Sequence, residues 1–177
     1  MFYCIYFFII GAFAGWILEC VFKAGMKKFN RAPGILNGPF CILYGVGTVI
    51  LATIIPAITA NIWLQFLLSA VILTFCEYVT YVLLQKMYGI ALWDYSDMRL
   101  AISEKVCVEF ACIWGVLGVL FIRYLLPVLR GVFFAISGTI PNLIIFALFV
   151  FISLDLLYTN DRLLRRSAIE TQDFIKI

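Results

Sequence analysis

The sequence predicts an all-α membrane protein, a polytopic helical bundle with about five transmembrane helices. Of the 177 residues, 65% are hydrophobic and 13% are charged, and the mean hydropathy is +1.09. A water-soluble domain is nearer half apolar and a quarter charged. The apolar residues also lie in stretches close to the roughly 20 residues that a bilayer-crossing helix needs. Both observations place the chain in a membrane.

Five apolar stretches are long enough to span the bilayer. We expect helices over residues 2–22, 40–58, 64–88, 106–126 and 141–158. The first is not typical of a cleaved signal peptide, because it has no basic start and because Glu19 lies where a small residue would precede the cleavage site. Residues 127–141 are apolar but contain two prolines and two glycines, which favours a short helix at the outer interface. We expect one transmembrane domain, residues 1–160, and a cytoplasmic tail, residues 161–177.

The basic residues predict the orientation. Eleven of the thirteen Lys and Arg residues fall in the first connection, the third connection and the tail, and only Arg123 and Arg130 fall toward the other side. Lys and Arg accumulate on the cytoplasmic side of membrane proteins. We therefore expect a multi-pass protein of the cell membrane with its N-terminus outside and its C-terminus in the cytoplasm. The net charge of +3 follows from this asymmetry and argues against a nucleic-acid partner.

Four carboxylates fall inside the predicted spans: Glu19, Glu77, Glu109 and Asp155. An ionised acid at a helix centre costs about 2.5–3.5 kcal/mol on insertion scales. In the predicted orientation all four lie in the cytoplasmic half or at its border. For Glu19, Glu109 and Asp155, a functional role and simple exposure at the inner interface are equally supported. Glu77 is nearer the midplane, which favours a functional role.

Polar side chains share one face of the third predicted span. They are spaced by multiples of four: Ser69, Glu77, Tyr81 and Gln85. Lipid offers no hydrogen-bond partner, so this face must contact protein or water. On the first span, Gly11 and Gly15 form a Gly-x-x-x-Gly pattern on the face of Glu19, and this pattern favours close packing of a neighbouring helix.

The first connection contains NRAPGILNGPF, residues 30–40, which is rich in turn formers and leads directly onto a helix N-terminus. Free N–H groups at a helix N-terminus favour an anion. Asn30, Arg31 and Asn37 could therefore bind a phosphate or carboxylate, and Arg31 could equally serve only as a cytoplasmic charge. The third connection contains Trp93 and Asp94, either as part of a site or as an interfacial aromatic beside a short cap.

Several blocks of sequence together resemble one family. They are GWILE (15–19), NRAPGILNGPFCILYGVG (30–47), Glu77-Tyr78, GIALWDYSD (89–97) and DLLYTND (155–161). These blocks are similar to the small, permease-like bacterial membrane proteins grouped as ABC-transporter type IV, over roughly residues 8–160. The resemblance implies a multi-helix membrane component. The sequence has no G-x-x-x-x-G-K-[ST] loop, so an ABC role requires a separate ATPase subunit.

The leading hypothesis is a transporter-like membrane component with a polar site in the cytoplasmic half of its bundle. Its predicted binding residues are Glu19, Asn30, Arg31, Asn37, Tyr44, Glu77, Trp93 and Asp94. The alternatives are a membrane-embedded enzyme acting on a lipid headgroup and a structural or regulatory membrane protein. We predict no cofactor and no metal site, because the six cysteines form no CxxC pair and His is absent. The expected partners are the lipid bilayer, an ATPase subunit and a second copy of the chain.

Overall fold

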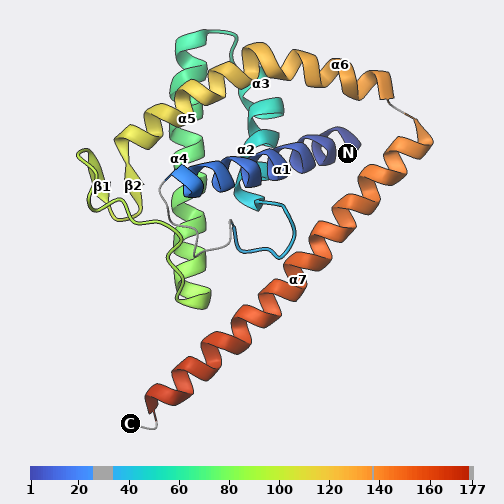
Figure 1. Ribbon diagram of the computed structural model, residues 1–177. Helices are drawn as coiled ribbons and strands as arrows, with labels where there is room; N and C mark the ends of the chain where they lie inside the picture. The colour runs from blue at the N-terminus through green and yellow to red at the C-terminus, as the bar shows by residue number, and fades with distance from the viewer. Residues whose placement is uncertain (26–33, 137, 176–177) are drawn as a thin grey trace.

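The computed structural model describes residues 1–25, 34–136 and 138–175, and most of them are helical (Figure 1). Helix α1 spans Phe2–Gly25. The second apolar helix consists of α2 (Ile42–Val49), the π-helix η1 (Ile50–Ile54) and α3 (Ile55–Ile58), and it is followed by α4 (Ile62–Tyr88). The fourth consists of α5 (Val108–Leu120), the π-helix η2 (Phe121–Leu125) and α6 (Leu126–Ile136), and α7 spans Thr139–Ile175.

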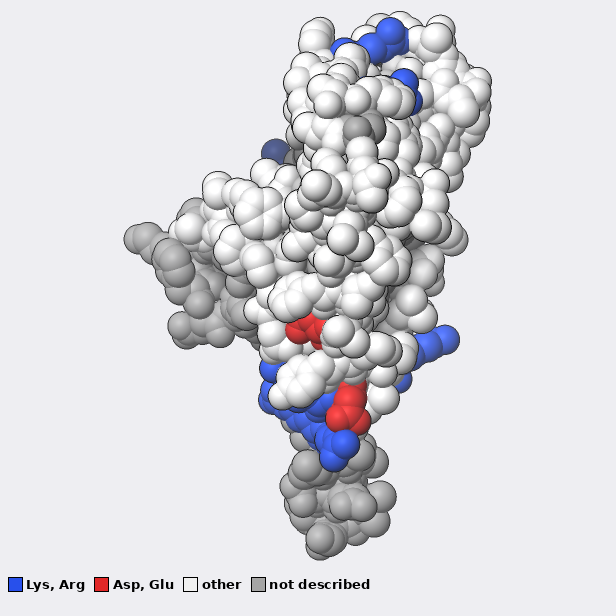
Figure 2. Space-filling view, turned by 90° about the vertical axis from the view of Figure 1, so that its right-hand side faces the viewer, with Lys and Arg blue, Asp and Glu red and all other residues white. Residues whose placement is uncertain are grey.

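Among the described residues, four helices are long and apolar enough to cross a membrane, and Ile42–Ile58 is a shorter apolar helix. The predicted all-α bundle of about five helices is therefore confirmed. Figure 2 adds that, on the face along α7, basic side chains gather at two ends and are separated by a broad uncharged band. Such a band is the surface that lipid tails require, since a charge in hydrocarbon is costly.

The structure differs from the sequence prediction where the fourth and fifth helices end. Residues 127–136 do not form a separate interfacial helix, because α6 continues directly from η2. Helix α7 likewise runs past residue 160, through most of the expected tail. Pro127 lies in α6, two residues after η2. A wide π turn beside the proline lets the helix continue where a regular α-helix would be broken.

The same arrangement occurs in the second apolar helix and explains the role of Arg130. Pro56 follows η1 and has no N–H to offer the carbonyl four residues earlier, that of Ala52. Arg130 on α6 donates from Nη2 to this carbonyl oxygen at 2.9 Å. Its Nε also donates to the Tyr3 hydroxyl at 2.6 Å. Arg130 thus ties α1, η1 and α6 together at one end of the bundle.

Small residues bring the helices into close contact in two pairs. A Cβ at Gly15 of α1 would lie 2.2 Å from Cβ of Tyr44 on α2, so only glycine fits this crossing. A Cβ at Gly118 of α5 would lie 2.3 Å from the Ser69 hydroxyl oxygen on α4. The close packing predicted from Gly-x-x-x-Gly in the first span is confirmed. These two pairs, α1 with α2 and α4 with α5, form the walls around the site.

Helix α4 carries the polar face of the bundle. It begins at Asn61, whose side chain accepts hydrogen bonds from the amides of Trp63 and Leu64, and it ends at Gly89, whose φ of 67° is the left-handed conformation of a helix C-terminus. The predicted polar stripe does face protein, because Ser69, Glu77 and Tyr81 are buried. Gln85, one turn from the end, is exposed.

The connection from α4 to α5 contains the strands. Strand β1 (Ala101–Ser103) pairs antiparallel with β2 (Val106–Cys107), so residues 101–107 form a short hairpin directly before α5. The sequence analysis did not predict this hairpin. The pairing holds the segment that precedes α5 beside α4, where the Lys105 amine lies over the Tyr81 ring, and Figure 1 shows the hairpin at the side of that helix. It therefore helps to bring loop residues 89–100 against the side of the bundle.

Candidate functional site

A cavity of about 320 Å³ lies among α1, α2, α4 and α5. Its wall is apolar over most of its area, with aliphatic residues of all four helices and of η2. Tyr44, Thr48, Glu77 and Trp114 supply its polar atoms, and Glu77 is the one charged residue among those that line it in the described part of the chain. We call this space the Glu77 cavity.

Glu77 is held by two ring side chains. The Tyr95 hydroxyl donates to Oε1 at 2.6 Å, and the Trp114 indole Nε1 donates to Oε2 at 3.2 Å. Only 4% of the glutamate surface is exposed. No Lys or Arg in the described ranges contacts Glu77, and the ion pairs of that part of the chain lie elsewhere. An indole N–H can only donate, which suits the ionised carboxylate as its acceptor. Both side-chain oxygens of Glu77 thus accept from neutral donors, an arrangement that suits the carboxylate form, and no cation of the described residues contacts them.

Tyr44 connects Glu77 with the second predicted acid. Its ring packs edge-on against the Trp114 ring, with centroids 5.7 Å apart, and its hydroxyl donates to Glu19 Oε1 at 3.1 Å. Glu19 does not line the cavity but lies behind Tyr44. The cavity wall thus places two aromatic rings between two carboxylates.

Tyr95 reaches Glu77 from the loop between α4 and β1. Its backbone N–H donates to the Glu104 carbonyl at 3.0 Å, and its ring stacks on Phe110 with centroids 4.8 Å apart. Burial and the neighbouring Glu77 raise the pKa of the Tyr95 hydroxyl above its usual value. Tyr95 is therefore a persistent neutral donor to the carboxylate over the physiological pH range.

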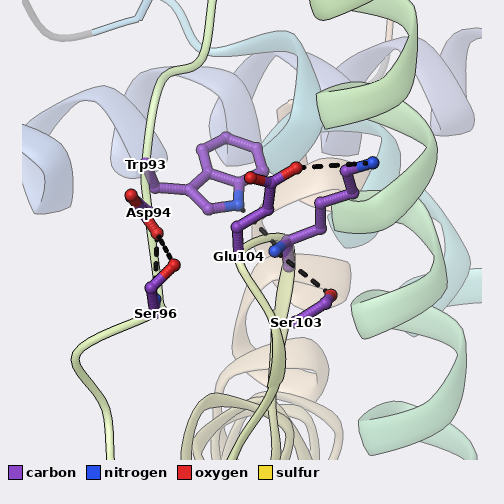
Figure 3. Close-up of polar contacts among 6 residues, drawn as sticks. Trp93, Asp94, Ser96, Ser103 and Glu104 are labelled. Carbon is purple, nitrogen blue, oxygen red and sulfur yellow. Dashed lines mark hydrogen bonds and ion pairs between the residues drawn. The ribbon is translucent and has the colours of Figure 1, made fainter.

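Trp93 and Asp94 lie on the same loop but outside the cavity. Figure 3 shows the Trp93 indole pointing toward the β1–β2 turn, where Nε1 donates to the Lys105 carbonyl at 3.4 Å. The ring also packs against Tyr81, with centroids 5.8 Å apart. Asp94 accepts from the Ser96 hydroxyl at 2.6 Å and the Ser96 amide at 2.9 Å. These bonds lower the pKa of Asp94 and fix the turn beside Tyr95.

Asn37, in the segment before α2, belongs to a second polar cluster, which it forms with residues of α7. Asp155 Oδ2 accepts from the Gly38 amide at 2.8 Å, and Oδ1 accepts from the Asn37 side-chain amide at 2.8 Å. Thr159 and Arg162 complete the cluster, with Arg162 donating to Asn37 Oδ1 at 2.7 Å. We call these five residues the Asp155 clamp. Backbone amides before the second helix do bind an anion, and that anion is the chain's own carboxylate.

The structure therefore brings together some of the predicted site residues and separates others. Tyr44 and Glu77 line the cavity, and Glu19 contacts Tyr44. The other predicted site residues that the structure describes lie elsewhere: Asn37 in the clamp, and Trp93 and Asp94 on the loop between α4 and β1. Asn30 and Arg31 lie outside the described residues. Their assignment to a binding site stays a prediction.

Two residues of the site were missed from sequence. Trp114 lies in a uniformly apolar stretch, where nothing in the pattern distinguishes a hydrogen-bonding indole from a lipid-facing one. Tyr95 lies within the WDYSD block, between the predicted residue Asp94 and Ser96. It follows α4 by only seven residues, and a loop of that length can fold back along the last turns of the helix as far as Glu77.

In the described residues no group of three or more His, Cys, Asp and Glu side chains is placed to hold a metal ion. The fold defines an integral membrane protein of the helical-bundle class, and the cavity is a mostly apolar space between four of its helices.

The comparison with protein families identifies the group to which this bundle belongs. Residues 6–160 match the family described as "Putative ABC-transporter type IV", and the chain belongs to that family. Searches of curated proteins and of solved structures found no match. The resemblance seen in the sequence blocks is confirmed, and the match includes the cavity and all of the clamp except Arg162.

Proposed function

We propose that the chain is the membrane-spanning, permease-like component of an ABC-type transporter, and that the Glu77 cavity holds the molecule it handles. The observation that carries this proposal is the cavity, about 320 Å³ between α1, α2, α4 and α5, with one buried carboxylate on a mostly apolar wall. Small-molecule sites are concave, mostly apolar and provided with a few placed polar groups. Membership of the family supports the same function.

The proposal includes an orientation. The N-terminus lies outside, residues 1–160 form the transmembrane domain, and residues 161–177 form a cytoplasmic tail that continues α7. Ile102 in β1 and Ile140 in α7 test this, because both are 73% exposed and the continuous helix α5–η2–α6 separates them. In a cysteine-free background, Ile140→Cys reacts with an impermeant external reagent and Ile102→Cys does not. The opposite labelling pattern contradicts the orientation.

An ATPase subunit has to supply the energy, because the sequence lacks a P-loop. We propose that it docks at the cytoplasmic end, near the β1–β2 hairpin. A photo-crosslinking side chain at position 102, introduced in the source cells, is expected to capture a P-loop ATPase identifiable by mass spectrometry. The same side chain at position 140 is the matched control and captures none. Failure to capture any ATPase from position 102 contradicts the ABC role.

The cavity's part in transport is tested in proteoliposomes that contain this chain and the captured ATPase. Ala14 of α1 lines the cavity, so Ala14→Phe fills it, whereas Ala24→Phe places the same ring on the same helix outside the cavity. We expect Ala14→Phe to uncouple ATP hydrolysis from the membrane component and Ala24→Phe to behave like wild type. Equal hydrolysis in all three contradicts the proposal. Phospholipid turnover by the purified chain alone indicates the lipid-headgroup enzyme instead.

A further inference from the structure

The Glu77 cavity carries charge, aromatic surface and apolar volume in one place. The charge is the Glu77 carboxylate, which is 4% exposed and has two neutral donors but no contacting cation in the described part of the chain. The aromatic surface is that of Tyr44 and Trp114, which line the same space. A buried carboxylate normally has a cationic partner, because an uncompensated charge in a low-dielectric interior is costly.

We propose that the cavity binds an organic cation, an ammonium or quaternary ammonium group on an apolar body. The inference rests on the proposed function only in taking the cavity as the ligand site. The cationic end lies at Glu77, beside the contacting rings of Tyr44 and Trp114 that line the same space, and the apolar body fills the aliphatic part of the cavity.

Three features select this ligand over the alternatives. An anion is repelled by the Glu77 carboxylate. A neutral apolar molecule fills the space but leaves the carboxylate without a counter-charge. An ammonium group is attracted both by the Glu77 carboxylate and by the aromatic rings. Cations bind over the faces of Trp and Tyr rings, and a desolvated contact of this kind contributes about 2 kcal/mol. Carboxylate and rings together therefore match a cation better than either feature alone.

A free organic amine and the ammonium headgroup of a membrane lipid share this chemistry. The cavity is open where its lining residues Leu18, Leu120 and Leu125 are half-exposed, so both a lipid headgroup and a free cation have access to it. The two sources are separable because a lipid ammonium is already present at high concentration in a bilayer that contains it. It then competes with an added probe.

The test uses two probes of the same shape, benzyltrimethylammonium and its uncharged isostere neopentylbenzene, with the protein in lipid nanodiscs and calorimetry as the readout. We expect the cation to bind about tenfold more tightly or better. Glu77→Gln keeps the shape of the side chain and brings the affinity for the cation down to that of the isostere. Glu109→Gln removes a carboxylate outside the cavity and is the matched control, with wild-type affinity for both probes.

Lipid composition identifies the source. Nanodiscs hold half phosphatidylglycerol in each case, with the other half phosphatidylcholine or an uncharged glycolipid, so that the surface charge is the same. Weaker probe binding in phosphatidylcholine assigns the site to a lipid headgroup, and equal binding assigns it to a free cation. Either result supports an ammonium site.

Two results overturn the inference: equal affinity for the cation and its isostere, or an unchanged cation affinity in Glu77→Gln. Ala14→Phe separates this failure from a failure of the proposed function. If Ala14→Phe abolishes binding of both probes while Glu77→Gln affects neither, the cavity is a ligand site without cation selectivity. If neither probe binds the wild type at all, the cavity is not a ligand site, and the proposed function loses its support as well.

Discussion

The Glu77 cavity and the Asp155 clamp each centre on a carboxylate inside an apolar helix, but the two acids are bonded differently. Asp155 takes hydrogen bonds from the backbone amide of Gly38 and the side chain of Asn37, and Arg162 lies on the far side of that side chain. Glu77 accepts its two hydrogen bonds from the side chains of Tyr95 and Trp114, and it lines the Glu77 cavity. The bonds of Asp155 join a loop to a helix and leave no space for a ligand.

The comparison teaches that an acid in a membrane helix is not by itself a mark of a ligand site. An acid whose donors come from the backbone of another segment stabilises the fold, because those donors would otherwise be unpaired. An acid that faces a cavity without a counter-charge has room and charge left for a ligand. The predictions below separate these two roles.

The largest effect is expected from a methyl group at the helix crossing beside the cavity. Gly15→Ala places a Cβ 2.2 Å from Cβ of Tyr44, so α1 and α2 must move apart. We expect a loss of about 3 kcal/mol, at the upper end of overpacking costs. Gly38→Ala makes the matched change in the clamp, where the nearest atom is Asp155 Oδ2 at 3.2 Å, and costs less. Thermal unfolding in nanodiscs measures both, and a larger loss for Gly38→Ala reverses the comparison.

The second-largest loss of stability is expected from removing the carboxylate of the Asp155 clamp. Asp155→Ala leaves the Gly38 amide and the Asn37 side chain without their acceptor, which costs about 1–2 kcal/mol for a partly exposed, charge-assisted cluster. Asp161→Ala is the control, since Asp161 lies two turns further along α7 and makes an exposed i,i+4 pair with Arg165. It should leave the Tm nearly unchanged. Equal effects of the two variants contradict a clamp.

Glu77→Gln should change stability by less than about 1 kcal/mol, because the amide keeps the hydrogen bonds. Its oxygen accepts from the Trp114 indole, and its NH₂ donates to the Tyr95 hydroxyl oxygen, which accepts as readily as it donates. The Tm in nanodiscs is the measurement. A fall as large as that of Asp155→Ala would make Glu77 a structural acid of the same kind.

The smallest effect is expected at Asp94, which caps a turn at the surface. Hydrogen bonds from Ser96 lower the pKa of Asp94, so its contribution is present above the ordinary pKa of an aspartate and is lost as pH falls through the lowered value. The Tm of Asp94→Ala should therefore lie slightly below that of wild type at neutral pH, and the difference should vanish in acid. A difference that grows on acidification contradicts this assignment.

The membrane bundle could be predicted from sequence because lipid imposes length and hydropathy on every span. The burial of Glu77 and the close packing at Gly15 could be predicted because residues four apart share one face of a helix, and a polar or glycine-rich face must contact protein in a membrane. The sequence also indicated that the turn before the second helix favours an anion. It could not say that Asp155 supplies it, since the two residues that meet, Gly38 and Asp155, are 117 positions apart.

The continuous fourth helix and the site's hydrogen-bond donors were beyond sequence reasoning. Pro127 indicates a helix break unless a π turn precedes it, and no local pattern announces that turn. Trp114 and Tyr95 reach Glu77 from different segments of the chain, so their pairing depends on how α4 packs against α5. Local propensity does not encode a contact between helices.

One measurement tests most directly whether the two acids have different roles: Glu77→Gln and Asp155→Asn, each assayed for Tm and for benzyltrimethylammonium affinity in the same nanodiscs. We predict that Glu77→Gln keeps the Tm and loses about tenfold or more in affinity. Asp155→Asn should lower the Tm and keep the affinity. If both variants lose Tm and affinity together, or if Asp155→Asn alone weakens cation binding, the two carboxylates do not have the separate roles that their surroundings indicate.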